Sequence, residues 1–214
     1  DNDLMGQVNI DQVGNSNQNK DQNDEKRALY LQHGFERPLF MMEENNVTPA
    51  QVGTATHLVF QKLPLTGTVT RKVVEQVIAD LCEDGLLSNS LAAKISIDGV
   101  VGLYQTKLGA EILQNQAALQ REAPIAMLYP AGKLFDGSQF RDVEQPVLIH
   151  GIIDGYFTDE QNKTILFDYK TDHVPANGSQ KVAESYRGQL NLYGLALQSI
   201  LGKDARIEKY IYLV

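Results

Sequence analysis

The chain has 214 residues, which fits one domain or one domain with a tail, and its 43% hydrophobic content supports a sizeable core. The single cysteine, Cys82, excludes a disulfide framework and a four-cysteine zinc or iron–sulfur site. A net charge of −8 at pH 7 argues against a generic nucleic-acid-binding protein, because such proteins are usually basic. No apolar run approaches the roughly 18 residues of a membrane span, and no leader peptide is visible, so we expect a cytoplasmic protein without membrane contact.

Residues 1–26 are rich in Asn, Gln and Asp, and their six acids and two lysines carry half of the net charge. Segments with so few apolar residues cannot bury enough surface to offset the entropy of ordering. We expect a disordered linker or tail there, a folded domain over 27–214, and an origin in a longer polypeptide. The chain has no G-x-x-x-x-G-K-[ST] phosphate loop, so any ATP-driven motor would lie outside it.

A helix is predicted from the capping box of Thr48 and Gln51 to about Leu63. Gly53 and His57 are four residues apart and therefore share one face of this helix. The small residue would let another element approach closely. His57 is either a metal ligand, as neutral imidazole, or a hydrogen-bonded core histidine.

Residues 70–116 show helical apolar spacing and predict a wall of short helices without assigned chemistry. The expected helices span about 70–84, 88–96, 98–107 and 109–115. A strand follows within 117–129. On it, Glu122 is an acid that supports the metal ligands, an additional metal-linked carboxylate, or a structural partner of Arg121 or Lys170.

The central feature is a predicted β-hairpin, with strands at 150–158 and 164–172 and a turn at Asp159–Lys163. Strand side chains alternate, so Asp168 and Lys170 point to the same side. Folding the hairpin about its turn places Asp154 opposite Asp168. Like charges at such positions destabilise a sheet, and a divalent cation between them would relieve the repulsion. Oxygen ligands of this kind suit Mg²⁺.

The alternative for a generic D-x-K sequence is a solvated strand face. Asp154, however, follows the apolar Ile152–Ile153, and Asp168 follows the apolar Ile165–Phe167. Acidic residues are depleted in such strands and are rarely buried without a partner. This context favours a functional site.

A long helix is predicted from Ser179, as its N-cap, to about Leu201, and a closing strand over 206–214. Gln189 and Tyr193 lie near one stripe of the helix, where they could hydrogen-bond a phosphate or the catalytic strand, and tyrosine can stack on a base. The helix would be the crossover to the closing strand. Together the elements predict an α/β fold: a central mixed sheet of four or five strands, flanked by helices on both faces, with a helical N-terminal portion.

Five pieces in this order resemble a known family. The chain is similar, over about residues 37–214, to RecB-type nuclease domains of the PD-(D/E)XK superfamily. The closest resemblance is to the carboxy-terminal nuclease domain of AddA-type (RexA) helicase–nucleases. The pieces are Gly53–His57 (G-x-x-x-H), Arg121–Pro124 (R-E-x-P), Asp154 in GIIDGYF, Asp168–Lys170 (D-x-K) and Gln189–Tyr193 (Q-x-x-x-Y).

The resemblance implies a restriction-endonuclease-like fold and a Mg²⁺-dependent DNA exonuclease in which Mn²⁺ can substitute. It implies single strands and duplex ends as substrates, in double-strand break processing and recombinational repair. ATP would act only through helicase domains of the same polypeptide, beside a second nuclease-bearing protein of the AddB/RexB type. The implied catalytic residues are Asp154, Asp168 and Lys170, the implied metal ligands are His57, Asp154, Asp168 and the Tyr169 carbonyl, and the implied supporting residues are Gln189, Tyr193 and Glu122.

Two alternatives remain. A noncatalytic DNA-binding or subunit-docking module with the nuclease fold agrees with the net charge of −8, although such a module has no need of Asp154, Asp168 and Lys170. A stand-alone PD-(D/E)XK nuclease, such as a restriction enzyme, is disfavoured by the missing basic surface.

Overall fold

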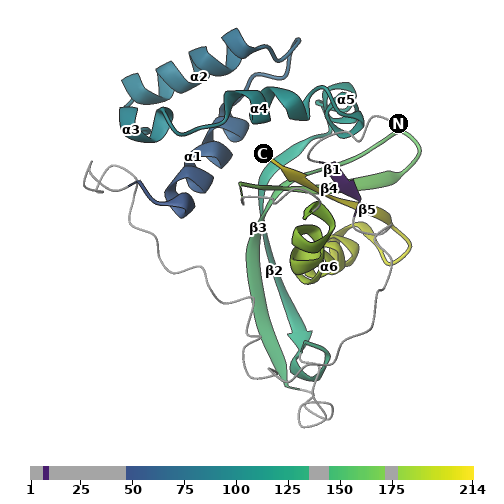
Figure 1. Cartoon of the computed structure of the whole chain (residues 1–214). Coiled ribbons are helices and arrows are strands. Elements are labelled where there is room, and N and C mark those ends of the chain that lie inside the picture. The colour runs from purple at the N-terminus through teal and green to yellow at the C-terminus, as the bar shows by residue number, and fades with distance from the viewer. Residues whose placement is uncertain (1–6, 10–46, 135–144, 172–177) are drawn as a thin grey trace.

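The computed structural model describes residues 7–9, 47–134, 145–171 and 178–214, which build a five-stranded mixed sheet between a group of N-terminal helices and one C-terminal helix (Figure 1). The sheet order is β1-β5-β4-β3-β2. This arrangement confirms the expected α/β fold with helices on both faces. The strands are β1 (Gln7–Asn9), β2 (Gln120–Pro130), β3 (Pro146–Thr158), β4 (Lys163–Lys170) and β5 (Arg206–Leu213).

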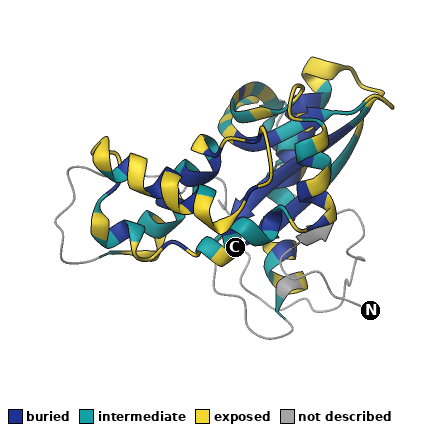
Figure 2. Ribbon diagram, turned by 90° about the horizontal axis from the view of Figure 1, so that it is seen from above, coloured by how far each residue is buried: buried dark blue, intermediate teal, exposed yellow. Residues whose placement is uncertain are grey.

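Two apolar cores lie on opposite faces of the sheet because the side chains of the central strands alternate. On β4, Ile165 and Phe167 pack into the larger core with the N-terminal helices, whereas Leu166 packs with the last helix. Figure 2 shows the N-terminal helices with buried residues, in dark blue, on their inner faces and exposed residues, in yellow, on their outer faces. The helices are α1 (Pro49–Lys62), α2 (Arg71–Glu83), α3 (Asn89–Ala92), α4 (Ile97–Leu103), α5 (Lys107–Gln114) and α6 (Ser179–Leu201).

The start of α1 follows the local sequence signal. The Thr48 hydroxyl accepts a hydrogen bond from the Gln51 amide at 3.3 Å, and Oε1 of Gln51 accepts one from the Thr48 amide at 2.6 Å. This reciprocal pair satisfies two amides that have no partner within the helix. The predicted capping box is confirmed, and it sets the first turn of the helix that carries His57.

The predicted register of the hairpin is also confirmed, since β3 and β4 pair Thr158 with Thr164 and Gly155 with Phe167. The strand bounds differ from the prediction. β3 begins at Pro146 rather than 150 because it continues its pairing with β2 beyond the hairpin. β4 ends at Lys170 rather than at 172.

β5 runs parallel to β4, and α6 is the crossover between them, as the sequence predicts. Gly178 rather than Ser179 is at the N-cap of α6. Residues Gln7–Asn9, which were expected in a disordered segment, form β1 against the outer edge of β5. Backbone pairing with an open edge does not require apolar content, so composition does not reveal it. The rest of the expected linker lies outside the described residues.

A short 3₁₀ turn, Ala131–Lys133, follows β2. Within the described ranges, no helix combines the length and apolar character needed to cross a bilayer.

Candidate active site

Three carboxylates lie in one row across neighbouring strands. Gly155 pairs with Phe167, so the next position of each strand brings Asp154 on β3 opposite Asp168 on β4. Both aspartates are buried, with 7% and 2% of their surface exposed. Two buried carboxylates at facing positions repel each other, so the row needs positive charge close by.

Glu122 completes the row on β2. Arg121 pairs with Gly155, so the next residues along the two strands, Glu122 and Asp154, fall opposite one another. Glu122 has a backbone φ of 51°, a left-handed conformation that is uncommon for residues other than glycine. Such outliers are often found at functional sites, where the surrounding structure holds them in place.

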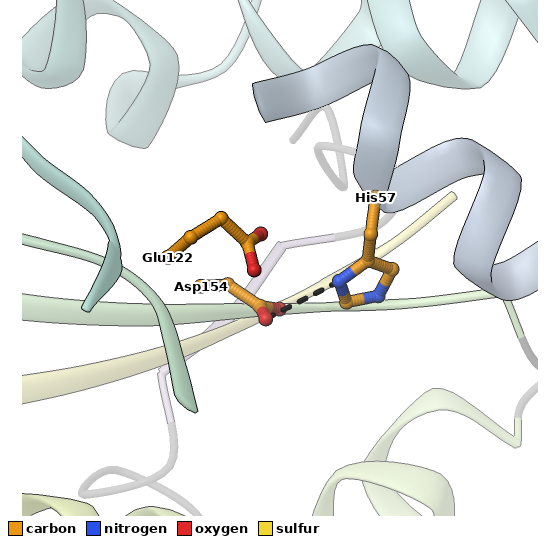
Figure 3. A group of neighbouring side chains, drawn as sticks. All are labelled: His57, Glu122 and Asp154. Atoms are coloured by element: carbon orange, nitrogen blue, oxygen red, sulfur yellow. Dashed lines mark ion pairs between the residues drawn. The ribbon is translucent and has the colours of Figure 1, made fainter. Parts of the chain in front are cut away.

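His57 joins Asp154 to the end of β4, and Figure 3 shows its pairing with Asp154. Its Nδ1 lies 3.2 Å from Oδ1 of Asp154, and its Nε2 lies 3.1 Å from the Tyr169 carbonyl oxygen. The other carboxylate oxygen of Asp154 accepts a 2.7 Å hydrogen bond from the Tyr169 amide. Both ring nitrogens therefore face acceptors, an arrangement that suits the imidazolium form. Burial lowers the pKa of His57, but the hydrogen bond and charge of Asp154 outweigh this effect and raise it.

A candidate metal site lies at this point. One ligand atom each from His57, Glu122 and Asp154 falls within 4.8 Å of the others, and Figure 3 shows the three side chains converging from α1, β2 and β3. Burial, followed by the charge of Asp154, raises the pKa of Glu122. Burial and the charge of Asp154 both disfavour the ionised form of the Glu122 carboxylate. A cation bound beside Glu122 would favour the ionised form instead.

Asp168 and Lys170 form the other half of the site. Lys170 Nζ lies 2.8 Å from Oδ2 of Asp168. Burial and then the charge of Asp154 raise the pKa of Asp168 to about 7, although Lys170 acts in the opposite direction. The Lys170 ammonium is thus a partner of the buried Oδ2. A buried carboxylate of this kind is a hard oxygen donor and fits a divalent cation.

Gln189 and Tyr193 lie on α6, as predicted, and contact each other. Nε2 of Gln189 donates a 2.9 Å hydrogen bond to the Tyr193 hydroxyl. The Tyr193 ring packs on β3 at Gly151, where an added Cβ would lie 3.2 Å from Cε1. The residue of α6 that contacts Lys170 is instead Tyr186, whose ring centroid lies 4.5 Å from Nζ. The only sequence signal for Tyr186 is its place one turn before Gln189.

Helix α1 is fixed to the sheet on the C-terminal side of His57. Nη1 of Arg121 donates hydrogen bonds to the carbonyls of Phe60, at 3.0 Å, and Leu63, at 2.9 Å, near the end of the helix. The Phe60 ring stacks on Tyr169 with centroids 3.9 Å apart. Arg121 therefore pairs with the helix end rather than with Glu122, and the ion pair of Lys170 is with Asp168. Within the described residues no ion pair joins Glu122 to Arg121 or Lys170, although the charge of Arg121 acts to lower the pKa of Glu122.

Gly53 allows the close approach that the sequence suggested. A Cβ at this position would lie 3.0 Å from Oγ1 of Thr171, the residue that follows Lys170. The end of β4 therefore packs directly on α1 one turn before His57, which keeps the histidine within reach of Asp154.

A mixed sheet that presents Asp154 and Asp-x-Lys on a hairpin, with a histidine from a preceding helix, defines a nuclease of the PD-(D/E)XK class. The sequence profile of the PD-(D/E)XK nuclease superfamily matches residues 26–214, and the chain belongs to this superfamily. It is thus a metal-dependent nuclease domain, and the resemblance noted in the sequence is confirmed.

Relatives named as the A subunits of ATP-dependent helicase/nucleases are similar to most of the chain. The protein from Ligilactobacillus salivarius is 42% identical over 212 residues, which are 99% of this chain and 16% of that relative. The protein from Levilactobacillus brevis is 38% identical over 189 residues, 86% of this chain and 15% of the relative. The protein from Limosilactobacillus fermentum is 42% identical over 189 residues, 85% of this chain and 14% of the relative. The chain spans about a sixth of the length of these curated relatives.

Proposed function

We propose that the chain hydrolyses phosphodiester bonds of DNA as the nuclease domain of a helicase–nuclease, and that its cofactor is Mg²⁺, with Mn²⁺ able to substitute. The observation that carries this proposal is the row of Glu122, Asp154 and Asp168, flanked by His57 on one side and Lys170 on the other. Hard oxygen donors with one imidazole fit a divalent cation. The names of the relatives support a link to a helicase motor.

In this proposal Asp154, Asp168, His57 and the Tyr169 carbonyl hold the metal, and Glu122 is close enough to add a carboxylate. When bound, a divalent metal polarises the scissile phosphate and lowers the pKa of its water. His57 must give up the proton that it shares with its acceptors, because only neutral imidazole is a ligand.

Lys170 is the positive group beside the reacting phosphate. Burial lowers the pKa of Lys170, but its ion pair with Asp168 more than compensates and raises it. The side chain therefore stays protonated, so that it orients the attacking water and stabilises the negative charge that develops on the phosphate. Gln189 and Tyr193 hold β3 in place at Gly151.

The names of the relatives support a wider role. We propose that single strands or duplex ends reach this site from helicase domains of the same polypeptide. A second nuclease-bearing protein of the AddB/RexB type would act beside it, in processing double-strand breaks for recombinational repair. Delivery by a motor accounts for the mildly acidic chain, since the affinity for DNA then comes from elsewhere. We propose a cytoplasmic location as part of this role.

The test is cleavage of linear single-stranded DNA by the full 214-residue chain, with Mg²⁺, with Mn²⁺ and with EDTA. The wild-type chain is expected to cut only with metal. Asp168→Ala is expected to abolish cleavage, and Lys170→Ala is expected to reduce it to a slow residual rate that still requires metal. Glu160→Ala, at an exposed position in the turn of the same hairpin, is the matched control and should cut like wild type. Full metal-dependent cleavage by Asp168→Ala would overturn the assignment.

The net charge of −8 favours a second candidate, a noncatalytic DNA-binding or docking module that keeps the fold. Calorimetric titration with Mg²⁺ separates the two. A chain that neither binds metal nor cuts DNA supports the module. Metal binding without cleavage supports a competent site that needs its motor to deliver DNA.

A further inference from the structure

The ammonium group of Lys170 lies between two partners from different elements. Asp168, two residues earlier on β4, contacts Nζ at 2.8 Å, and the ring of Tyr186 on α6 lies 4.5 Å from it. The lysine side chain is only 17% exposed, so few other positions are open to it.

Asp168 alone does not fix the direction of this ammonium group. A lysine side chain has a flexible four-carbon stem and three equivalent donors, so one carboxylate leaves it several arrangements. An aromatic face within about 6 Å attracts a cation through its quadrupole and adds a second, directional contact. Tyr186 supplies this contact from a rigid 23-residue helix that also packs against the sheet.

We propose that Tyr186 is a positioning residue for the reaction, and that its ring holds the Lys170 ammonium beside Asp168 before the phosphate arrives. The inference rests on the nuclease function proposed above. It gives Tyr186 a role distinct from stacking on a DNA base, because the ring face directed at Lys170 is not available to a base. The aromatic ring of Tyr186, rather than its hydroxyl, makes the contact that positions Lys170.

The geometry is tested by NMR without metal or DNA. A ring at this distance shifts the ε-methylene protons of Lys170 upfield, and the Lys170→Met variant assigns those signals. We expect the upfield shift to disappear in Tyr186→Leu and to remain in Tyr186→Phe. An unchanged Lys170 shift in Tyr186→Leu would overturn the proposal, whether or not the chain cuts DNA.

The consequence is tested by steady-state cleavage of single-stranded DNA. Tyr186→Leu is expected to lower kcat about 3- to 30-fold with KM unchanged, in line with a cation–π contact at a partly desolvated site. Tyr186→Phe should recover most of this loss. Val182→Ala, one turn earlier on α6 and in the same apolar cluster, controls for lost packing and should leave kcat at the wild-type level.

A residue that acts through Lys170 has no effect once Lys170 is gone. Metal-dependent residual cleavage by Lys170→Met should therefore not fall further in the double variant Tyr186→Leu/Lys170→Met. Independent, additive losses would overturn the proposal, and so would a Tyr186→Phe variant as slow as Tyr186→Leu. If wild type neither binds metal nor cuts DNA, the nuclease proposal fails, while the NMR shifts still decide whether Tyr186 positions Lys170.

Discussion

Arg121 and Leu63 are joined across 58 residues of sequence by a 2.9 Å hydrogen bond from a guanidinium nitrogen to a main-chain carbonyl. The same nitrogen also reaches the Phe60 carbonyl. We predict that Arg121→Met lowers the free energy of unfolding by about 2 kcal/mol, because it leaves helix-end carbonyls without a charged donor. Urea denaturation measures this loss.

The matched control for Arg121 is Arg71→Met. Arg71 makes ion pairs with Glu75 and Asp98, but more than half of its side chain is exposed. Exposed pairs contribute about 0–1 kcal/mol, so this variant should cost less than about 1 kcal/mol. Equal losses at the two positions would show that Arg121 does not brace α1.

Gly155 and Gly194 are predicted to respond in opposite ways to alanine. A Cβ at Gly155 would lie 2.1 Å from the fully buried Phe167 ring, so Gly155→Ala should destabilise the chain by about 3 kcal/mol. At Gly194, inside α6, the nearest atoms are flexible methylenes of Lys209 at 3.6 Å. Gly194→Ala should stabilise by about 0.5–1 kcal/mol through helix propensity. The thermal unfolding midpoints of the two variants, compared with that of wild type, test both predictions.

Bound metal is predicted to stabilise the fold. The carboxylates of Glu122, Asp154 and Asp168 repel one another in the metal-free chain, and a cation that binds only the folded state shifts the unfolding equilibrium. At about 100 times its dissociation constant, Mn²⁺ or Mg²⁺ should add roughly 2.7 kcal/mol, and EDTA should remove it. Asp154→Asn should lose this response, and a variant that keeps it would place the metal elsewhere.

Glu122 is predicted to contribute to metal affinity. Its carboxylate lies within 4.8 Å of ligand atoms of His57 and Asp154. Glu122→Gln should weaken Mn²⁺ binding in calorimetry by about 10-fold or more, which is the range for residues that ligate or support a metal. Glu111→Gln is the control, because this half-buried glutamate pairs with Lys107 on α5. Equal affinities in the two variants would remove Glu122 from the site.

Local patterns predicted the features that depend on neighbouring residues. The Thr48 capping box spans four residues, and the hairpin register follows from a short turn, so both could be predicted and both are confirmed. The pairing of Asp154 with Asp168 follows from that register. The α6 crossover was predictable because helix and strand periods differ along the chain.

The features that were missed depend on backbone angles or on distant contacts. The left-handed φ of Glu122 has no signal in a glutamate, although the sequence did suggest this residue as a metal-linked carboxylate. The bond from Arg121 to α1 and the contact of Tyr186 with Lys170 join separate elements. Sequence spacing reveals which residues share a helix face, but not which face meets which strand.

The hydrogen bond between His57 and the Tyr169 carbonyl spans 112 residues, whereas the hairpin that carries both aspartates closes over a short turn. Long-range contacts require the closure of large loops, which costs entropy and slows folding. We therefore expect the hairpin to form early and α1 to dock late during refolding. Until that step the carboxylates lack the histidine, so metal affinity should report the arrival of α1 and distinguish a native chain from a collapsed one.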